Sequence, residues 1–235
     1  MSWKTLIPEP IARVGLRARS WLDGRWYRKP EGHRGIRKLG HREYVGGLWD
    51  EMGKLQFEFL VAQGLKPADV LVDVGCGSLR GGVHFIKYLE PGNYLGIEKE
   101  PELLELGVAD ELGQDVLASR RPELVASSSF EFERFSKKPN FALAQSLFTH
   151  LTPEHITLCM DKLRAFAGPG SRFFATFFER RGEDVSNPGK DHDHNVFRYS
   201  TEQMRAFGEE HGWRFHYIGD WEHPRGQIMV EYLAH

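Results

Sequence analysis

The chain has 235 residues, of which 40% are hydrophobic and 27% are charged, with a formal net charge of −2. This length and composition are typical of one globular domain with a substantial core. No apolar run approaches the ~20 residues that span a bilayer. No apolar region followed by a cleavage site marks a secretory signal, and the weak net charge disfavours a nucleic-acid partner.

The two cysteines, Cys76 and Cys159, show no metal-ligand spacing. Cys76 lies inside a glycine-rich loop, where a disulfide would be awkward. We therefore expect a reducing compartment, and the cytoplasm is the simplest location that provides one.

The first 42 residues differ from the rest of the chain in charge. They hold eleven Lys/Arg and three Asp/Glu, a charge of +8, and three tryptophans are interleaved with the basic residues. Residues 10–22 predict a short basic amphipathic helix, and residues 23–35 predict a loop. Two interpretations stay open. One is a solvated extension that packs its tryptophans on the domain; the other is a peripheral contact with an anionic membrane surface or an anionic carrier.

From residue 43 onward, predicted helices and strands alternate. Apolar residues recur at helical spacing in 44–65, where Gly64 marks the expected end of a helix. A Ser/Thr pair followed by Glu202 predicts a capping box. Further helices are predicted at 81–89, 101–113, 152–168 and 200–213. The predicted strands are 69–75, 93–100, 130–135, 141–148, 171–179, 214–221 and 227–233.

This alternation predicts the fold class. Strands separated by helices indicate βαβ units, and so a mainly parallel sheet with helices on both faces. The last two strands, joined by "EHPRG", indicate an antiparallel C-terminal hairpin. We expect an α/β domain over residues 43–235, preceded by a basic extension over residues 1–42.

The stretch "VLVDVGCGSLRGG", residues 70–82, follows a strand and opens a helix, the context in which a glycine motif binds a nucleotide. Gly75 and Gly77 allow a tight turn and the close approach of a ligand. In a dinucleotide fingerprint, a third glycine would stand where this chain has Arg80. Asp73, just before the glycines, would disfavour a pyrophosphate and suit a ligand with an ammonium group.

Glu98 ends the next predicted strand, 21 residues beyond Gly77, about where an acid that hydrogen-bonds a ribose is expected. Together with Asp73 and the glycines, it favours a nucleoside ligand with a cationic amino end. S-adenosylmethionine (SAM) fits this description, and NAD fits it less well. The alternative is an ordinary strand–helix turn in which Glu98 caps a helix.

Residues 70–82 and Glu98 resemble motif I and the ribose-binding acid of the class I SAM-dependent methyltransferases. The stretches "YVGGLWDEMGKLQFEFL", "SLFTHLTPEH" and "HPRGQIMVEYL" are similar to a bacterial branch of that family linked to glycan and secondary-metabolite tailoring. The resemblance covers about residues 43–235. It implies a Rossmann-like seven-stranded sheet in the order 3-2-1-4-5-7-6, with strand 7 antiparallel. It also implies SAM as the cofactor, across the carboxyl ends of strands 1, 2 and 4.

The resemblance further implies which residues contact the cofactor. One group would surround the methionine end, Glu98 would hold the ribose, and Lys99 would flank the adenine. No clear partner for the adenine amino group is offered by "SSSFEFERF". The methionine-end group is Asp73, Gly75, Cys76, Gly77 and Arg80, with Gln145 and Ser146 closing the cleft and Trp49 and Gln56 covering it.

A hydroxyl that accepts a methyl group must lose a proton, and a histidine near neutral pKa is the natural base. His150, in "SLFTHLTPEH", is expected just after the fourth strand, at the rim over the cofactor. The alternative is a local role at the start of the next helix. His155 belongs to that helix and is expected to be structural.

A second histidine cluster lies in the predicted polar loop 180–196. Here Asp191, His192, Asp193 and His194 are consecutive. Such residues sometimes bind a divalent metal, but adjacent positions on a loop have no fixed face. We therefore predict no metal, and expect a lid that supplies His192 or His194 to the substrate.

The acceptor is the least defined part of the prediction. After the fourth strand, Gln145-Ser146-Leu147-Phe148 stands where amide-methylating enzymes carry an Asn-Pro-Pro-Tyr-like motif. His223 and Arg225, in the hairpin turn, are candidates to border the acceptor site. The favoured function is O-methylation of a sugar or small-metabolite hydroxyl, with a small-molecule or glycan acceptor and no nucleic acid. The alternatives are N-methylation of a small amine, an NAD-dependent oxidoreductase, and a non-catalytic SAM-binding or interaction module.

Overall fold

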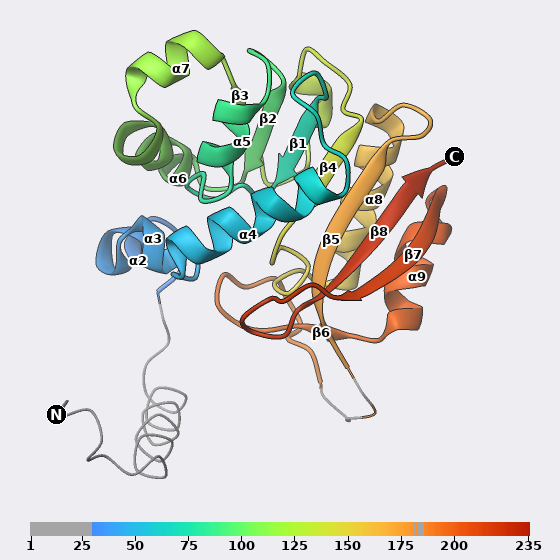
Figure 1. Ribbon diagram of the computed structural model, residues 1–235. Coiled ribbons are helices and arrows are strands. Elements are labelled where there is room, and N and C mark those ends of the chain that lie inside the picture. Colours follow the sequence, from blue (N-terminus) through green and yellow to red (C-terminus); the bar gives the residue numbers. More distant parts are fainter. Residues whose placement is uncertain (1–29, 181, 183–185) are drawn as a thin grey trace, which may run out of the picture. The chain divides into compact units, whose positions relative to one another are not determined.

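Strand β1 (Leu71–Val74) lies inside the sheet, and all four of its residues are buried. The computed structural model describes residues 30–180, 182 and 186–235, and residues 31–235 form one compact unit (Figure 1). The other strands are β2 (Tyr94–Glu98), β3 (Glu123–Ala126), β4 (Phe141–Ala144), β5 (Arg172–Glu179), β6 (Arg198–Tyr199), β7 (Trp213–Asp220) and β8 (Ile228–Ala234). The longer helices are α2 (Gly32–Leu39), α4 (Trp49–Ala62), α5 (Gly82–Tyr88), α6 (Pro101–Leu106), α7 (Gln114–Arg120), α8 (Pro153–Phe166) and α9 (Thr201–Glu209), with a short α3 (His41–Tyr44).

The strands follow the order β3-β2-β1-β4-β5-β8-β7. Strands β1 to β5 pair in parallel, whereas β8 pairs antiparallel with both β5 and β7. A short β6 adds a parallel pairing at the end of β5. The predicted fold class, strand order and antiparallel hairpin are therefore confirmed. All parallel strands end at one edge of the sheet, where an open α/β sheet binds its ligands.

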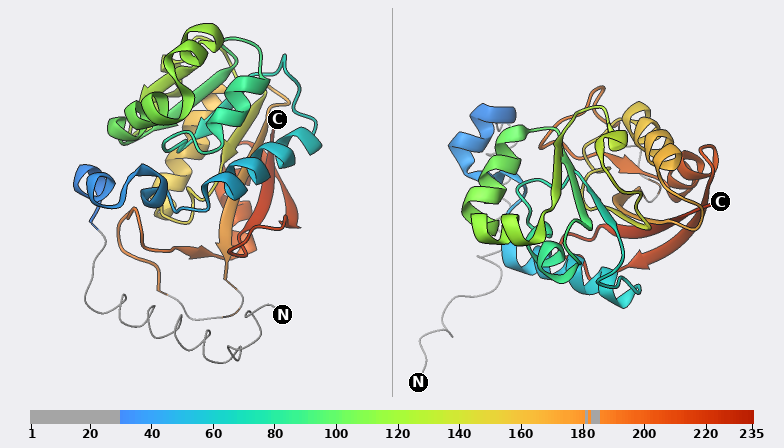
Figure 2. Two further views of the ribbon diagram at one scale, coloured as in Figure 1. Left: turned by 60° about the vertical axis from the view of Figure 1, so that its left-hand side comes forward. Right: turned by 90° about the horizontal axis from the view of Figure 1, so that it is seen from above.

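Helices cover both faces of the sheet (Figure 2). On one face, α8 and α9 pack on strand residues that include Val72 and Ile97. On the other face, α4 and α5 pack on the alternate residues, including Leu71 and Leu143. Because successive side chains of a strand point to opposite faces, each strand contributes to both cores. This explains the nearly continuous apolar character of the strand sequences.

The third strand differs from the prediction. It is β3, whereas the predicted segment 130–135 forms a loop with a short 3₁₀ helix at Phe132–Arg134. Phe130 has a φ of 55°, which no strand residue adopts. Phe132 stacks on Phe166 of α8, with ring centroids 6.4 Å apart. The alternation of phenylalanine with charged residues therefore reflects burial against a helix and not a strand.

The segment before residue 43 also differs from the prediction in part. The predicted loop 23–35 ends earlier than expected, because residues 32–35 begin helix α2, whose Ile36 is buried against the domain. The compact unit begins at Glu31, so α2 and α3 belong to it. The predicted basic helix at 10–22 lies outside the described residues.

Helix α6 continues into a π-helical turn, Gly107–Leu112, within the predicted helix 101–113. A Cβ on Gly107 would lie 2.7 Å from the Ser78 carbonyl oxygen, so the turn passes directly against the glycine loop. A π turn is frequent at functional sites. Here it brings the helix close to the loop that follows β1.

Several smaller predictions have clear outcomes. Helix α4 ends just before Gly64, which has a φ of 99°. The capping box is formed by Ser200 and Gln203, not by Glu202. Both cysteines are free and buried. Among the residues that the structure describes, none of the helices is long and apolar enough to cross a membrane.

Candidate functional site

The glycine loop between β1 and α5 is held by the end of β2. The backbone N–H groups of Gly75 and Cys76 both donate to the Ile97 carbonyl, at 2.8 and 3.1 Å. Gly75 and Gly77 have φ values of 72° and 56°. A Cβ on Gly77 would also lie 2.9 Å from Val45 Cγ1. The positive φ values confirm the predicted tight turn, and the close approach of Val45 adds a second reason for glycine at position 77.

Glu98 is fixed at the end of β2 by three backbone N–H groups. Its carboxylate accepts from Gly77 at 3.0 Å, from Lys99 at 2.9 Å and from Glu100 at 3.1 Å. Burial raises the pKa of Glu98, and the hydrogen bonds partly offset this effect. A carboxylate accepts about four hydrogen bonds, so one direction is left for a ligand hydroxyl.

Asp73 lies on β1, below the glycine loop, and is 4% exposed. The Tyr94 hydroxyl donates to its Oδ2 at 2.7 Å. Burial raises the pKa of Asp73 to about 6, although the hydrogen bond from Tyr94 and the charge of Arg80 act in the opposite direction. A buried carboxylate of this kind attracts a cationic ligand group.

Arg80 stands at the third-glycine position and is 8% exposed. Its Nη1 donates to the carbonyls of Val45 and Gly47, at 3.1 and 2.9 Å, and its Nη2 donates to Gln145 Oε1 at 2.8 Å. Burial and the nearby Arg225 lower its pKa to about 10, so the guanidinium remains charged near neutral pH. Arg80 thus joins the glycine loop, the 45–47 loop and the end of β4.

Gln145 and Ser146 follow β4 and enter a polar network. Gln145 Nε2 donates to Ser146 Oγ at 2.5 Å, and the Ser146 N–H donates to Thr176 Oγ1 at 2.7 Å. Gln227 Nε2 donates to Ser146 Oγ at 2.8 Å. Ser146 has a φ of 59°. These hydrogen bonds hold Ser146 and the Gln227 amide in place before any ligand binds.

The orientation of the Gln145 amide follows from Arg80. A guanidinium can only donate hydrogen bonds, so the Gln145 atom that faces Arg80 must be the oxygen. Its nitrogen therefore faces His223 Nε2, at 3.3 Å. His223 Nδ1 accepts from the Arg225 N–H at 3.1 Å, which places the ring proton on Nε2.

His150 has the opposite tautomer. Its Nδ1 lies 2.9 Å from the Asn195 carbonyl, which can only accept a hydrogen bond. The proton is therefore on Nδ1 and the lone pair on Nε2. Burial lowers the pKa of His150, so the ring is neutral at neutral pH. A neutral imidazole with its Nδ1–H anchored is the arrangement that a general base needs.

The loop that carries His192 and His194 crosses to the N-terminal helices (Figure 1). Asp193 pairs with Lys99 Nζ, accepts from the Tyr44 hydroxyl, and accepts from the Gly32 N–H at 3.1 Å. Burial alone would raise the pKa of Asp193, but the hydrogen bonds from Lys99 and Tyr44 hold it below its usual value. We call the set of Asp193, Lys99 and Tyr44 the clasp.

The two loop histidines contact the N-terminal segment beside the clasp. His194 packs edge-on against the Tyr44 ring, with centroids 5.1 Å apart. His192 Nε2 lies 2.9 Å from Glu31 Oε1. The His192 N–H donates to the His150 carbonyl at 3.1 Å, so the three predicted histidines lie together.

The four consecutive residues of the loop point to different partners. Asp191 accepts from the Thr152 N–H at 2.6 Å and pairs with His155, whereas Asp193 belongs to the clasp. Within residues 30–180, 182 and 186–235, no group of three or more His, Cys, Asp or Glu is placed to hold a metal ion.

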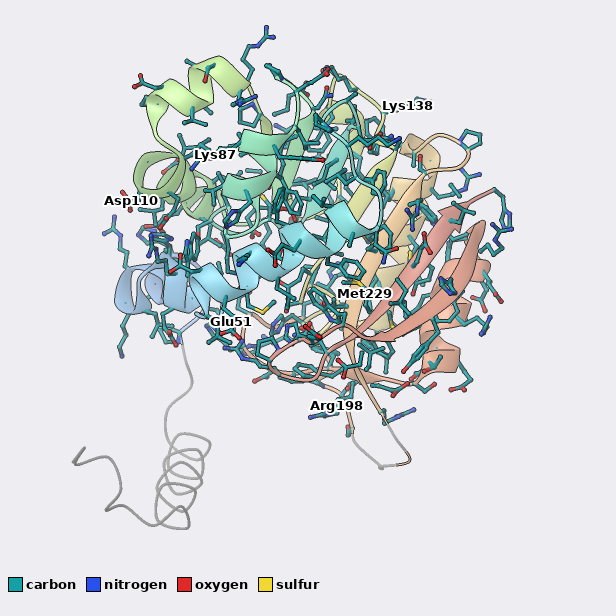
Figure 3. All side chains as sticks on the ribbon, viewed as in Figure 1. Glu51, Lys87, Asp110, Lys138, Arg198 and Met229 are labelled. Carbon is teal, nitrogen blue, oxygen red and sulfur yellow. The ribbon has the colours of Figure 1, made fainter. Side chains whose placement is uncertain are left out.

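Two predicted cofactor residues, Trp49 and Gln56, come from α4. The Trp49 ring contacts the rings and cations of α3, His41 at 5.5 Å and Arg42 at 5.0 Å, and so supports that helix. Gln56 lies behind the start of α5, where a Cβ on Gly81 would come within 2.6 Å of its Oε1. Figure 3 shows Asp110, a 3.7 Å partner of His41, on the same side as α3.

Three residues of the site were not predicted from the sequence. Tyr94 binds Asp73 from the neighbouring strand, Tyr44 belongs to the clasp, and Val45 covers Gly77. The parallel register pairs Asp73 with Gly96, which has no side chain. Tyr94 lies two residues earlier on the same face of the sheet, so its side chain reaches Asp73. A register argument would have found Tyr94, whereas the other two contacts depend on how the chain before α4 folds back.

No protein-family model matches the sequence. Solved structures match its fold. The magnesium protoporphyrin IX methyltransferase of Synechocystis PCC 6803, with bound SAH, has a TM-score of 0.56 and 11% identity, over 97% of this chain and all of that one. An amino pentose methyltransferase of Micromonospora echinaspora, with bound SAM, has a TM-score of 0.57 and 13% identity, over 89% of this chain and all of that one.

A glycopeptide N-methyltransferase complexed with SAM has a TM-score of 0.58 and 13% identity, over 78% of this chain and 94% of that one. At such low identity these likenesses concern the fold. The chain has the Rossmann-like fold of the SAM-dependent methyltransferases, and the structures it resembles bind their cofactor on that fold.

Proposed function

We propose that the chain is a SAM-dependent methyltransferase that transfers the methyl group to a hydroxyl of a sugar or another small metabolite. The observation that carries this proposal is the arrangement of Asp73, Arg80 and Glu98 around the glycine loop. The three side chains come from β1, from the turn before α5 and from β2, and all are buried. They converge where an open α/β sheet binds its ligand.

The residues present fit SAM in charge. A methionine moiety carries an ammonium and a carboxylate, and the site offers a buried carboxylate, Asp73, and a buried guanidinium, Arg80. Glu98 keeps one acceptor direction for a ribose hydroxyl. A pyrophosphate would instead meet the charge of Asp73, which argues against NAD. The intact site also argues against a non-catalytic module.

When bound, SAM would supply a methyl group on a sulfonium, whose transfer to oxygen forms a C–O bond, breaks the C–S bond and leaves the electron pair on sulfur. The hydroxyl proton must then leave. His150 Nε2 holds a lone pair, and its Nδ1–H is fixed by the Asn195 carbonyl at 2.9 Å. We assign His150 as the base that takes this proton.

The clasp would hold the loop over the site during the reaction. Because Lys99 directly follows Glu98, closing the clasp brings the loop with His192 and His194 over the ribose and adenine side. Their contacts with Glu31 and Tyr44 give these histidines a positioning role. Exclusion of water by such a lid favours methyl transfer.

The class of methyl acceptor is proposed by analogy with the structures that match the fold. The matched structures are named as enzymes of a porphyrin, an amino pentose and a glycopeptide, which are small or glycan-bearing molecules. We propose an acceptor of this general kind and no nucleic acid. N-methylation of a small amine is the alternative, because an amine needs less base catalysis.

Calorimetric titration of the full chain with SAM, SAH and NAD tests the cofactor. Micromolar binding of the two adenosyl ligands without NAD binding is expected. Radioactive methyl transfer from labelled SAM to a panel of sugars and small metabolites then tests the reaction. Binding of NAD alone, or of none of the three ligands, would refute the proposal.

The basic segment before residue 30 is proposed to contact an anionic membrane surface or carrier. Its removal should leave SAM affinity unchanged, because residues 31–235 form a compact unit. Methyl transfer to an anionic or carrier-linked acceptor should fall. Full activity after truncation would show that this segment does not contribute.

A further inference from the structure

A cavity of about 430 Å³ lies at the carboxyl edge of the sheet, at the ends of β5 and β7. Its lining includes Phe178, Glu179, Arg198, Asp220, Glu222 and His223. None of its lining residues belongs to the glycine loop. Figure 3 shows Arg198 at the lower edge of the molecule, below β5. The volume is that of a pocket for a small molecule.

His223 connects this cavity to the cofactor site. It is 6% exposed and lines the cavity, and its Nε2 lies 3.3 Å from the Gln145 amide nitrogen. Gln145 in turn accepts from Arg80 at 2.8 Å. One side chain, His223, therefore separates the cavity from Gln145 at the end of β4, which the proposal above places at the methyl-donor site.

The Nε2–H of His223 has no acceptor among the described residues. Its Nδ1 accepts backbone N–H groups, so Nε2 carries the proton. The neighbouring Gln145 nitrogen is itself a donor, because the Gln145 oxygen faces Arg80. Two donors at 3.3 Å do not satisfy each other. Because His223 lines the cavity, an oxygen of a ligand bound there would give this N–H the acceptor that the Gln145 nitrogen cannot supply.

Positively charged residues lie on one side of His223, and negatively charged residues lie on the other. Burial lowers the pKa of His223 to about 4, and the charges of Arg225 and Arg80 on the cofactor side add to this effect, so the ring is neutral. The cavity side carries carboxylates. Asp220 accepts from the Glu222 N–H at 2.9 Å, and neither of these two side chains forms an ion pair with a residue that the structure describes.

The other charged groups of the cavity have different surroundings. Glu179 accepts from the Thr201 and Tyr217 hydroxyls, at 2.7 and 3.2 Å. The Arg198 guanidinium lies over the Phe178 ring, 5.3 Å from its centroid. The hairpin side of the cavity, formed by Asp220 and Glu222, is therefore its acidic side.

We propose that this cavity binds the methyl acceptor, and that the acceptor carries a protonated amino group near Asp220 and Glu222 and an oxygen that accepts the hydrogen bond of His223. A molecule of this size with both groups is an amino sugar or a similar amino alcohol. The inference rests on the proposed function, and it specifies the acceptor class. The amino group serves for recognition, and a hydroxyl is methylated.

The experiment uses the full chain saturated with SAH and matched pairs of probes. D-Glucosamine, D-galactosamine and D-mannosamine are titrated by calorimetry beside their N-acetyl forms, which differ mainly in charge. At least one amine should bind about tenfold more tightly than its N-acetyl form, because a carboxylate pair favours the cation. The difference should shrink at high salt.

Variants assign the effect to the cavity. Asp220→Asn with Glu222→Gln should remove about tenfold of the amine affinity and leave the N-acetyl affinity within about twofold. Glu210→Gln, an exposed acid on α9, is the matched control and should change neither. His223→Phe should weaken the amine and the N-acetyl form alike, because it removes the N–H donor that bonds to the ligand oxygen.

Three results would overturn the inference: equal binding of amines and N-acetyl forms, binding of none of the amines, or an amine preference that survives in the double variant. The SAH titration is made first. If SAH itself does not bind, the proposed function fails. If SAH binds and the amine preference is absent, the inference about the acceptor fails alone.

Discussion

Asp193 and Lys99 form an ion pair although 94 positions separate them in the sequence. The pair joins the loop after β5 to the end of β2, next to the glutamate that holds the glycine loop. Tyr44 completes the clasp from α3. Three distant segments thus meet at the clasp, beside the end of β2.

Asp193→Asn should open the clasp. The substitution keeps the size of the side chain and removes its charge, so Lys99 loses its partner. We expect the dissociation constant of SAH to rise about three- to tenfold, mostly through faster release, as for a lid that opens more often. Calorimetry measures the dissociation constant, and stopped-flow experiments measure the release rate.

Asp161→Asn, which breaks an exposed pair with His211 on a distant helix, is the control. An unchanged release rate would mean that the clasp does not cover the cofactor.

Gly77→Val should abolish SAM binding and leave the fold largely intact. A Cβ at this position would lie 2.9 Å from Val45 Cγ1, and the φ of 56° is unfavourable for a branched residue. The loop must therefore move away from Glu98. We expect a loss of more than about a hundredfold in affinity, measured by calorimetry, with far-UV circular dichroism as the test of folding.

Gly113→Val is the matched control for this variant. Gly113 has a φ of 84°, but no atom lies within 4 Å of its added Cβ. It should lose about 1–3 kcal/mol of stability through backbone strain and keep its SAM affinity. If both variants lost the same SAM affinity, the effect of Gly77→Val would come from backbone strain and not from the contact with Val45.

The sequence predicts most of the fold because the signals for its elements are local. The β1 run, the βαβ alternation and the C-terminal hairpin each depend on residues close together in the chain. Segment 130–135 fails for a physical reason: its phenylalanines alternate like a strand, but they are buried by α8, which lies far along the chain. Local pattern does not reveal which partner buries a residue.

The candidate site also combines residues that local sequence patterns predict with contacts that only the folded chain creates. Asp73, Gly77 and Glu98 lie in a single strand–loop–helix–strand unit, and the structure brings them together as expected. The partners that fix their chemistry come from elsewhere. Tyr94, the 45–47 loop and the clasp are set by register and by long-range folding, which spacing along the sequence does not encode.

Asp73 should make stability depend on pH. Its pKa in the folded protein is about 6, above the 3.8 of the free side chain, so the folded state binds more protons between these values. Stability from this group is fully present below about pH 4 and is lost as the pH rises through about 6, by about 3 kcal/mol. Asp73→Asn should remove this dependence and keep the Tyr94 hydrogen bond.

Urea unfolding of the wild type and of Asp73→Asn at intervals from pH 4 to 7.5 measures the difference between their free energies of unfolding. The wild type should lose stability relative to Asp73→Asn as the pH rises, because all other groups are shared. SAM affinity should rise over the same interval in the wild type, since its ammonium pairs with the ionised carboxylate. A constant difference in stability would show that Asp73 is not perturbed.

His150→Gln should separate chemistry from binding. The variant loses the lone pair of Nε2 but can still donate to the Asn195 carbonyl. We expect methyl transfer to fall about 10²- to 10³-fold with the acceptor found in the screen, and SAH affinity to stay within about twofold. His211→Gln, at a distant surface pair, should be fully active.

The pH profile of the same reaction distinguishes a base from a merely structural histidine. Burial lowers the pKa of His150 below its usual 6.5, so the lone pair is present above that lowered value. At saturating SAM, where the effect of Asp73 on SAM affinity does not contribute, wild-type kcat/KM for the acceptor should therefore rise with pH through a pKa below 6.5 and then stay level. The residual activity of His150→Gln should lack this rise. If the variant keeps the wild-type profile, the proton is taken by another group, and His150 only anchors the loop at Asn195.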